Sequence, residues 1–201
     1  MTTGRFIALE GGEASGKSTQ AARLAGALGA VATREPGGTR IGALVRAIVL
    51  DPAGQDLTDR AEALLYAADR AQHITEVVRP ALAAGRHVVT DRSPLSSIAY
   101  QGYGRGIDPE VIRKLSGWAI DDCWPELAVL LDIAPGAALG RLDRSFDRLE
   151  SEGLEFHERV REGYLKMAAA EPDRWMVVDA DQPAAEVAVA VRRAVADRLG
   201  L

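Results

Sequence analysis

The sequence predicts an α/β fold in which helices cover both faces of a parallel sheet of about five strands, giving three layers. Short apolar runs alternate with longer segments of helical periodicity along the whole chain, which is typical of βαβ units. The apolar runs are nearly continuous, as in strands that are buried on both faces. A length of 201 residues, with 47% hydrophobic and 26% charged residues, predicts one domain over residues 1–201 with a substantial core.

Five short apolar segments are the predicted strands. The first runs into a glycine pair after Glu10, and the third delivers Asp91 at its end. The segments are residues 6–9, 31–33, 87–91, 127–133 and 175–178. Because ligands of parallel sheets bind beyond the carboxyl ends of the strands, we expect the site in the loops after Glu10, Thr33 and Asp91.

The segments between the strands have helical spacing. Thr58 is the expected N-cap of a long helix that stops at Gly85, with a kink or division at Pro80. Pro109 is expected at the first position of another helix, and residues 102–106 are expected to form a flexible turn. The predicted helices are residues 18–28, 41–50, 58–84, 94–103, 109–120, 135–142, 149–170 and 183–199.

Charge and composition exclude several classes of function. A formal net charge of −5 argues against a general nucleic-acid or anionic-membrane binder. The single cysteine, Cys123, excludes an intramolecular disulfide and fits a reducing compartment. No apolar run has the length of a signal peptide core or a membrane span. We therefore expect a cytoplasmic protein with neither a nucleic-acid nor a membrane partner.

A phosphate-binding loop follows the first predicted strand and opens the first predicted helix. The pattern G-x-x-x-x-G-K-[ST] is matched by Gly11, Gly12, Glu13, Ala14, Ser15, Gly16, Lys17 and Ser18, with Thr19 next. The glycines let the loop amides point inward, and the helix N-terminus adds partial positive charge. Lys17 can reach the β- and γ-phosphates of a nucleotide, and Ser18 can ligate Mg²⁺. The chain contains only three lysines, which weighs against a chance match.

The loop indicates phosphoryl chemistry on a purine nucleotide without naming the reaction. A regulatory GTPase would need an N/T-K-x-D motif to read guanine. The chain has no asparagine, and neither Lys114 nor Lys166 lies in such a motif. A P-loop ATPase switch that binds a protein partner stays open on this evidence.

Residues that could hold an acceptor lie on two further segments. Tyr66 and Arg70 are i, i+4 neighbours on one helix face, which suits a base and a phosphate, although a core tyrosine with a surface ion pair is the alternative. Asp91 is placed to organise Mg²⁺ and its water at the end of a strand. Arg92 lies beside it, at the sheet edge that carries the phosphate-binding loop, which favours a functional role.

Four segments accompany the phosphate-binding loop in order along the chain: residues 33–39 (TREPGGT), 64–70 (LLYAADR), 91–102 (with DRS, then SIAYQG) and 147–150 (DRLE). Their order and spacing resemble bacterial thymidylate kinases across nearly the whole chain. The resemblance implies a P-loop kinase fold and transfer of the γ-phosphoryl group of ATP to dTMP, with Mg²⁺, for dTTP synthesis. It also implies a homodimer. Another nucleoside or nucleotide kinase is the nearest alternative.

The resemblance also implies roles on the acceptor side. Tyr66, where the family usually has phenylalanine, is implied to stack on thymine. Arg70 is implied at the base and Arg92 at the acceptor phosphate, and the loop around Pro36 is implied to close over the acceptor. The implied acceptor-binding residues are Glu13, Pro36, Tyr66, Arg70, Arg92, Ser97, Tyr100 and Gln101.

A short lid is implied over residues 141–150. Some relatives carry a basic residue in the phosphate-binding loop where this chain has Ser15, and others supply an arginine from the lid. Arg141 and Arg144 are implied at the ATP phosphates, and Arg148 is implied to be catalytic with Lys17 and Arg92, while which lid arginine reaches the phosphates stays open. Asp147 and Glu150 are expected to assist the metal or anchor the lid, with a solvated helix start as the alternative.

Overall fold

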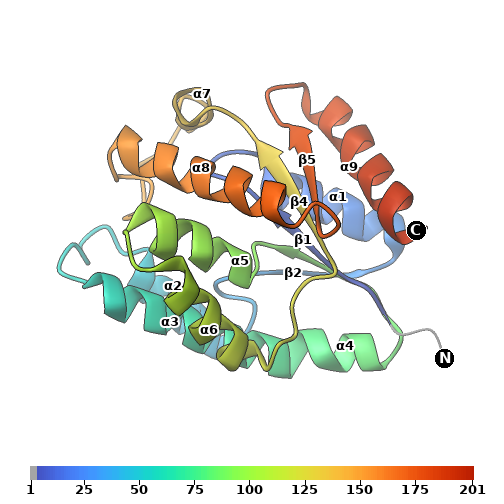
Figure 1. The fold of residues 1–201 in the computed structure, drawn as a ribbon, viewed down its shortest axis with the longest axis horizontal. Helices are drawn as coiled ribbons and strands as arrows, with labels where there is room; N and C mark the ends of the chain where they lie inside the picture. The colour runs from blue at the N-terminus through green and yellow to red at the C-terminus, as the bar shows by residue number, and fades with distance from the viewer. Residues whose placement is uncertain (1–3) are drawn as a thin grey trace.

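The computed structural model describes residues 4–201, which contain one parallel sheet of five strands (Figure 1). The strand order is β2-β3-β1-β4-β5, and every neighbouring pair is parallel. The strands are β1 (Phe6–Glu10), β2 (Val31–Arg34), β3 (Val88–Asp91), β4 (Leu127–Asp132) and β5 (Trp175–Asp179). The predicted parallel sheet is confirmed, and each strand lies within one or two residues of its predicted bounds.

The register of the central strands brings the phosphate-binding loop next to Asp91. Leu9 of β1 pairs with Asp91 of β3, and Glu10 pairs with Leu130 of β4, so all three strands end at one edge. β1 lies where the chain turns from the β2–β3 side of the sheet to the β4–β5 side. A strand-order reversal of this kind opens a crevice at the carboxyl edge, which is where ligands bind in such sheets.

Helices cover both faces of the sheet, as predicted. Val129 and Leu131 of β4 pack against α1 (Lys17–Leu28) and α9 (Ala184–Leu199), which lie side by side in Figure 1. Ala128 and Leu130, which alternate with them, face the opposite layer. That layer contains α2 (Arg40–Val49), α3 (Asp59–His73), α5 (Pro94–Ser97), α6 (Pro109–Ile120) and α8 (Leu154–Ala170). Within residues 4–201, no helix combines the length and apolar character needed to cross a membrane.

The long helix predicted over residues 58–84 is interrupted at a different place from the kink or division predicted at Pro80. Thr58 caps α3 by accepting a hydrogen bond from the Ala61 amide. The helix then widens into a π-helical turn, η1 (Ile74–Val78), and continues as α4 (Arg79–Ala83). The change thus comes in the turn just before Pro80, where a proline inside a continuous helix removes one backbone donor and its ring crowds the preceding turn.

The turn predicted over residues 102–106 is confined to its end, where Arg105 forms a turn and Gly106 has a φ angle of 77°. α5 continues as a π-helix, η2 (Ile98–Gly104), so Gly102 and Gly104 are helical. A Cβ on Gly104 would lie 2.7 Å from Phe156 and 2.9 Å from Val160. Gly104 therefore serves close packing of η2 against α8, and a glycine used in this way cannot be distinguished from a turn glycine by local sequence.

The predicted lid segment connects two helices that are shorter than expected. α7 (Pro135–Leu139) ends three residues early, and α8 begins at Leu154 instead of residue 149. Residues 140–153 between them consist of turns and loop.

Candidate active site

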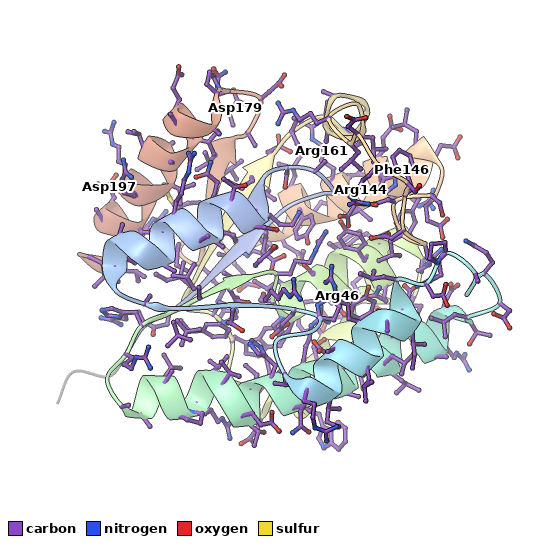
Figure 2. The ribbon with its side chains drawn as sticks, turned by 180° about the vertical axis from the view of Figure 1, so that it is seen from behind. Arg46, Arg144, Phe146, Arg161, Asp179 and Asp197 are labelled. Carbon is purple, nitrogen blue, oxygen red and sulfur yellow. The ribbon has the colours of Figure 1, made fainter. Side chains whose placement is uncertain are left out.

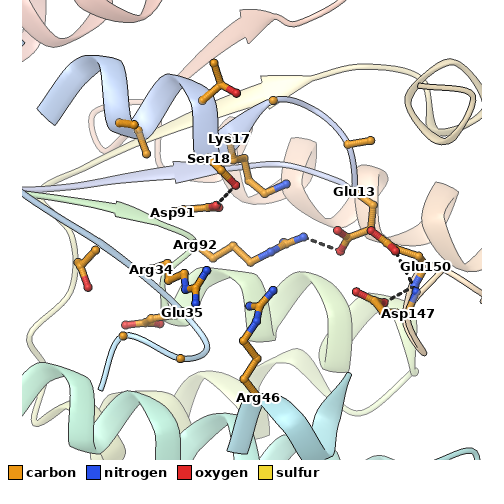
Figure 3. Close-up of a pocket in the computed structure, with 18 of the residues that line it drawn as sticks. Glu13, Lys17, Ser18, Arg34, Glu35, Arg46, Asp91, Arg92, Asp147 and Glu150 are labelled. Carbon is orange, nitrogen blue, oxygen red and sulfur yellow. Dashed lines mark hydrogen bonds and ion pairs between the residues drawn. The ribbon is translucent and has the colours of Figure 1, made fainter. Parts of the chain in front are cut away.

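A large cleft, called here the outer cleft, opens at the carboxyl edge of the sheet (Figure 3). The phosphate-binding loop, the ends of β2 and β3, the helix α2 and the lid segment surround it. Ten of the residues predicted for the site line it: Glu13, Ala14, Gly16, Lys17, Ser18, Thr19, Asp91, Arg92, Arg141 and Arg144.

The phosphate-binding loop has the backbone that its glycines predict. Gly11 and Gly16 have φ angles of 142° and 90°, which are unfavourable for other residues. A Cβ on Gly11 would also lie 2.6 Å from the Leu131 carbonyl oxygen. Lys17 Nζ folds back over the loop and donates to the Gly12 carbonyl at 2.5 Å and to Ser15 Oγ at 3.2 Å. Burial, together with the charge of Arg92, lowers the pKa of Lys17 to about 8.

Ser18 and Asp91, the two residues predicted to hold a metal ion, meet at the edge of the outer cleft. The Ser18 hydroxyl donates to Asp91 Oδ2 (Figure 3), and Asp91 Oδ1 is buried without a hydrogen-bond partner in the described chain. A hydroxyl and a carboxylate are oxygen donors of the kind that Mg²⁺ prefers when phosphates and water complete its shell. Within residues 4–201 there is no cluster of three or more histidine, cysteine, aspartate or glutamate side chains that could bind a metal without such help.

A smaller inner pocket adjoins the outer cleft and shares Glu13, Arg46, Arg92 and Asp147 with it. Seven of the eight predicted acceptor-binding residues line this pocket: Glu13, Pro36, Tyr66, Arg70, Arg92, Tyr100 and Gln101. The eighth, Ser97, does not line it. Ser97 is buried and accepts a hydrogen bond from Arg70, while the neighbouring Ser96 lines the pocket instead.

Arg92 is held at the boundary between the two cavities by several contacts. Its backbone has a φ angle of 69°, which is rare for a residue with a side chain. Its Nη2 donates to Glu13 Oε1 at 2.5 Å and to the Tyr100 hydroxyl at 3.0 Å, and its Nη1 donates to the Gly11 carbonyl at 3.2 Å. Burial alone would raise the pKa of Glu13, but the cations of Arg92 and Lys17 outweigh it and lower the pKa to about 2. Glu13 is therefore ionised at neutral pH.

Arg70 is fixed from behind by a buried network. Its Nε donates to Glu35 Oε2 at 2.9 Å, and the other Glu35 oxygen lies 2.7 Å from His73 Nδ1. The guanidinium carbon of Arg70 lies 5.4 Å from the centroid of the Tyr66 ring, so the two predicted neighbours do share a face. This arrangement presents an aromatic surface and a cation to the inner pocket, and the alternative of a surface ion pair is excluded because Arg70 is buried.

The three lid arginines have different surroundings. Arg141 donates to Asp181 at 2.8 Å, and Arg144 makes a two-pronged pair with Glu150 at 2.5 and 2.7 Å, while both line the outer cleft. Arg148 lines neither cavity. Its side chain is buried against α3, where it binds Glu62 and donates from Nε to the Val49 carbonyl at 2.9 Å.

Two further arginines at the site carry no role in the sequence prediction. Arg46 of α2 lines both cavities, donates to the Pro36 carbonyl at 3.1 Å, and points from α2 toward the interior in Figure 2. Arg34 at the end of β2 lines the outer cleft, and Figure 3 shows Arg34, Arg46 and Arg92 converging on one space. Arg46 had a detectable signal, since it is the one charged residue in the apolar stretch of residues 41–50.

Sequence comparisons with known proteins show which family the chain resembles. The sequence model of the thymidylate kinase family matches residues 9–191. A thymidylate kinase from Clavibacter michiganensis is 54% identical over 198 residues, which cover 94% of this chain and 93% of that protein. One from Oleidesulfovibrio alaskensis is 46% identical, covering 96% of this chain and 97% of that protein.

A solved structure gives the same result for the fold. The crystal structure of thymidylate kinase from Ehrlichia chaffeensis superposes with a TM-score of 0.81 and 30% sequence identity. The match covers 96% of this chain and 99% of that one. The P-loop kinase fold predicted from the sequence is therefore confirmed, and the chain belongs to the thymidylate kinase family.

Proposed function

We propose that this chain transfers the γ-phosphoryl group of ATP to dTMP, giving ADP and dTDP for dTTP synthesis. The observation that carries the proposal is the pair of adjoining cavities. A phosphate-binding loop lines the outer cleft, the Tyr66–Arg70 face lines the inner pocket, and Arg92 stands between them. Such an arrangement would bring a donor phosphate and an acceptor phosphate next to one another.

On the donor side, the loop amides and the N-terminus of α1 would receive the ATP phosphates. Lys17 would turn from the Gly12 carbonyl toward the β- and γ-phosphates. Arg141 and Arg144 are the lid arginines that line the outer cleft, and Arg144 is half exposed, so it can exchange Glu150 for a phosphate. Arg148 would anchor the lid to α3 instead of reaching the phosphates, because its guanidinium is buried in contacts with Glu62 and Val49.

Ser18 and Asp91 would hold Mg²⁺ together with the donor phosphates. The unpartnered Asp91 Oδ1 and the oxygen character of both groups support this assignment. The ion, when bound, would neutralise charge on the donor phosphates.

On the acceptor side, Tyr66 would stack on thymine, and Arg70 and Gln101 would meet the polar edge of the base. Arg92 and Arg46 would receive the acceptor phosphate, since both line the two cavities. Neutralising that phosphate lets its oxygen approach the γ-phosphorus in line, and the bond to the β-phosphate breaks as the new bond forms. Closure of the lid and of the loop at Pro36 would exclude water that otherwise hydrolyses ATP.

A panel of acceptors tests the proposal directly. The protein is incubated with ATP and Mg²⁺ alone, or with dTMP, dUMP, dCMP, AMP or thymidine, and ADP release is measured. The expected result is fast turnover with dTMP and slow turnover without an acceptor. Preference for thymidine would instead indicate a nucleoside kinase. Hydrolysis that no acceptor stimulates would indicate an ATPase switch.

We also propose that the chain forms a homodimer through an apolar face on three adjacent helices. Leu44 and Ile48 of α2, Leu64 of α3, and Val111 and Trp118 of α6 are all exposed, with Trp118 exposed at 82%. α3 packs against both α2 and α6, so these exposed side chains lie on neighbouring helices. Exposed apolar side chains gathered in this way mark an interaction site. In a two-fold symmetric dimer, each copy buries the same face against the other.

Sedimentation tests the dimer. Trp118→Asp should convert the protein to a monomer at micromolar concentration. Val189→Asp on α9, another exposed apolar helix position, is the matched control and should leave the dimer intact. A wild-type monomer would refute this part of the proposal. We also propose a cytoplasmic location, which fits a nucleotide kinase.

A further inference from the structure

Glu62 is a buried carboxylate that no step of the proposed reaction uses. It lies in the first turn of α3, its side chain has no exposed surface, and it has three partners from distant parts of the chain. Gln101 Nε2 donates to Oε1 at 2.8 Å, Arg105 Nη2 donates to Oε2 at 3.1 Å, and Arg148 also donates to Oε2. One of these partners, Gln101, lines the inner pocket.

The two arginines keep Glu62 charged. Burial alone would raise the pKa of this carboxyl, but hydrogen bonds from Arg105, Gln101 and Arg148 outweigh burial and lower it. An ionised carboxylate accepts hydrogen bonds and donates none. The Gln101 amide must therefore turn its NH₂ group to Glu62, and its carbonyl oxygen is the group left for the inner pocket.

Arg70 supplies the complementary group on the same pocket. Its guanidinium has only donors. Nε donates to Glu35 and Nη1 donates to Ser97, so other N–H groups remain for a ligand. The pocket thus offers one fixed acceptor, from Gln101, and fixed donors, from Arg70. A ring with a carbonyl next to an N–H, such as the 4-oxo, N3–H edge of thymine or uracil, satisfies both, whereas cytosine presents a donor and an acceptor in the opposite order.

We propose that Glu62 is a positioning residue that determines nucleobase specificity: it orients the Gln101 amide so that the pocket accepts a 4-oxopyrimidine and rejects a 4-aminopyrimidine. The inference rests on the proposed dTMP-kinase activity. Arg148 takes part without lining the pocket, because it helps to keep Glu62 charged and joins the lid segment to α3.

Discrimination between bases tests the proposal. The KM for dTMP and the inhibition constant of dCMP against dTMP phosphorylation are measured, so dCMP need not be a substrate. The variants are Glu62→Gln, Gln101→Ala and the double variant. Glu152→Gln is the matched control, because Glu152 pairs with Arg105 at 2.5 Å without contacting Gln101. The ratio of the two constants does not depend on the fraction of folded enzyme, so a loss of stability does not imitate a loss of specificity.

Glu62→Gln should lower the dCMP-to-dTMP ratio of these constants about tenfold or more, since a neutral side chain accepts either amide orientation. The dUMP-to-dTMP ratio and the KM for ATP should stay within about twofold, because both pyrimidines share the same polar edge. Glu152→Gln should leave all three unchanged. In the Gln101→Ala background, Glu62→Gln should change nothing further.

The proposal is overturned if Glu62→Gln keeps the wild-type dCMP-to-dTMP ratio, or if it lowers that ratio equally without Gln101. Failure of the wild-type protein to phosphorylate dTMP would refute the proposed function instead, so the two failures are distinguishable.

Discussion

Arg148 and Arg144, four residues apart in the lid, should respond to substitution in opposite ways. Arg148 is buried, with its guanidinium on a fully buried Glu62 and on a buried backbone carbonyl, whereas the Arg144 side chain is 55% exposed. Substituting methionine keeps most of the side-chain volume and removes the charge. Arg148→Met should therefore lower stability, and Arg144→Met should lower turnover.

The magnitudes follow from burial. Removing one partner of a buried ion pair costs about 3–5 kcal/mol, and the lower value applies because Arg105 and Gln101 remain on Glu62. For a chain of this length, about 3 kcal/mol lowers the melting temperature by about 6–12 °C. Arg144 is exposed, and the buried Glu150 keeps the hydrogen bond from the Asp147 amide when Arg144 is removed. The loss should therefore be about 1 kcal/mol, and Arg144→Met should melt within about 4 °C of wild type.

Thermal unfolding and kcat at saturating ATP and dTMP separate the two roles. Arg144→Met should reduce kcat about 10³-fold, as expected for an arginine at the transferring group, and Arg148→Met less than about tenfold in the folded enzyme. The reasoning is refuted if Arg148→Met melts within about 2 °C of wild type and loses roughly 100-fold in kcat. The first result would mean that the contacts of Arg148 with Glu62 and Val49 add little to stability. Together these results would indicate that Arg148 contacts the phosphates when the lid is closed.

Three other residues of the site give separate predictions. Lys17 must be protonated to hold phosphates, and its pKa in the free protein is about 8. The KM for ATP should therefore be constant below about pH 7.5 and rise about tenfold per pH unit above about pH 8.5. In a pH series of initial rates, Lys17→Arg should abolish this rise. Tyr66→Ala should raise the KM for dTMP at least about tenfold and leave the KM for ATP within about twofold, because the lost stacking surface lines only the inner pocket; equal weakening of both substrates would indicate a structural role. Arg92→Lys should lower kcat/KM for dTMP about 100-fold or more in steady-state assays, since an ammonium cannot keep the Glu13, Tyr100 and Gly11 contacts together, and near-normal activity would contradict the role assigned to it.

Much of the site is predictable from sequence because its parts are local. The phosphate-binding loop is one contiguous pattern between a strand and a helix. Tyr66 and Arg70 share a face by helical spacing, and the structure brings both to the inner pocket. Asp91 reaches Ser18 because parallel strands end at one edge of the sheet.

Other parts depend on contacts that no local pattern encodes. Ser96 and Ser97 differ by about 100° around a helix, so which of them faces the pocket depends on how the helix is rotated in the fold. Arg148 has the same sequence signal as Arg144, and only the position of Glu62, 86 residues away, turns it inward. Gly104 was predicted in a turn because its packing partners lie on a helix some fifty residues later.

The close approach at Gly104 restricts the order in which this sequence can evolve. Any side chain at that position would overlap the Phe156 ring and Val160, while the Tyr100 ring meets the same Phe156 ring edge-on, with centroids 6.1 Å apart. A larger residue at 104 is tolerated only after 156 or 160 has become smaller, and a smaller residue at 156 removes support from Tyr100 in the pocket. Sequence change on the buried side of α8 is therefore limited by selection on the substrate site, although neither Phe156 nor Val160 belongs to a recognisable motif.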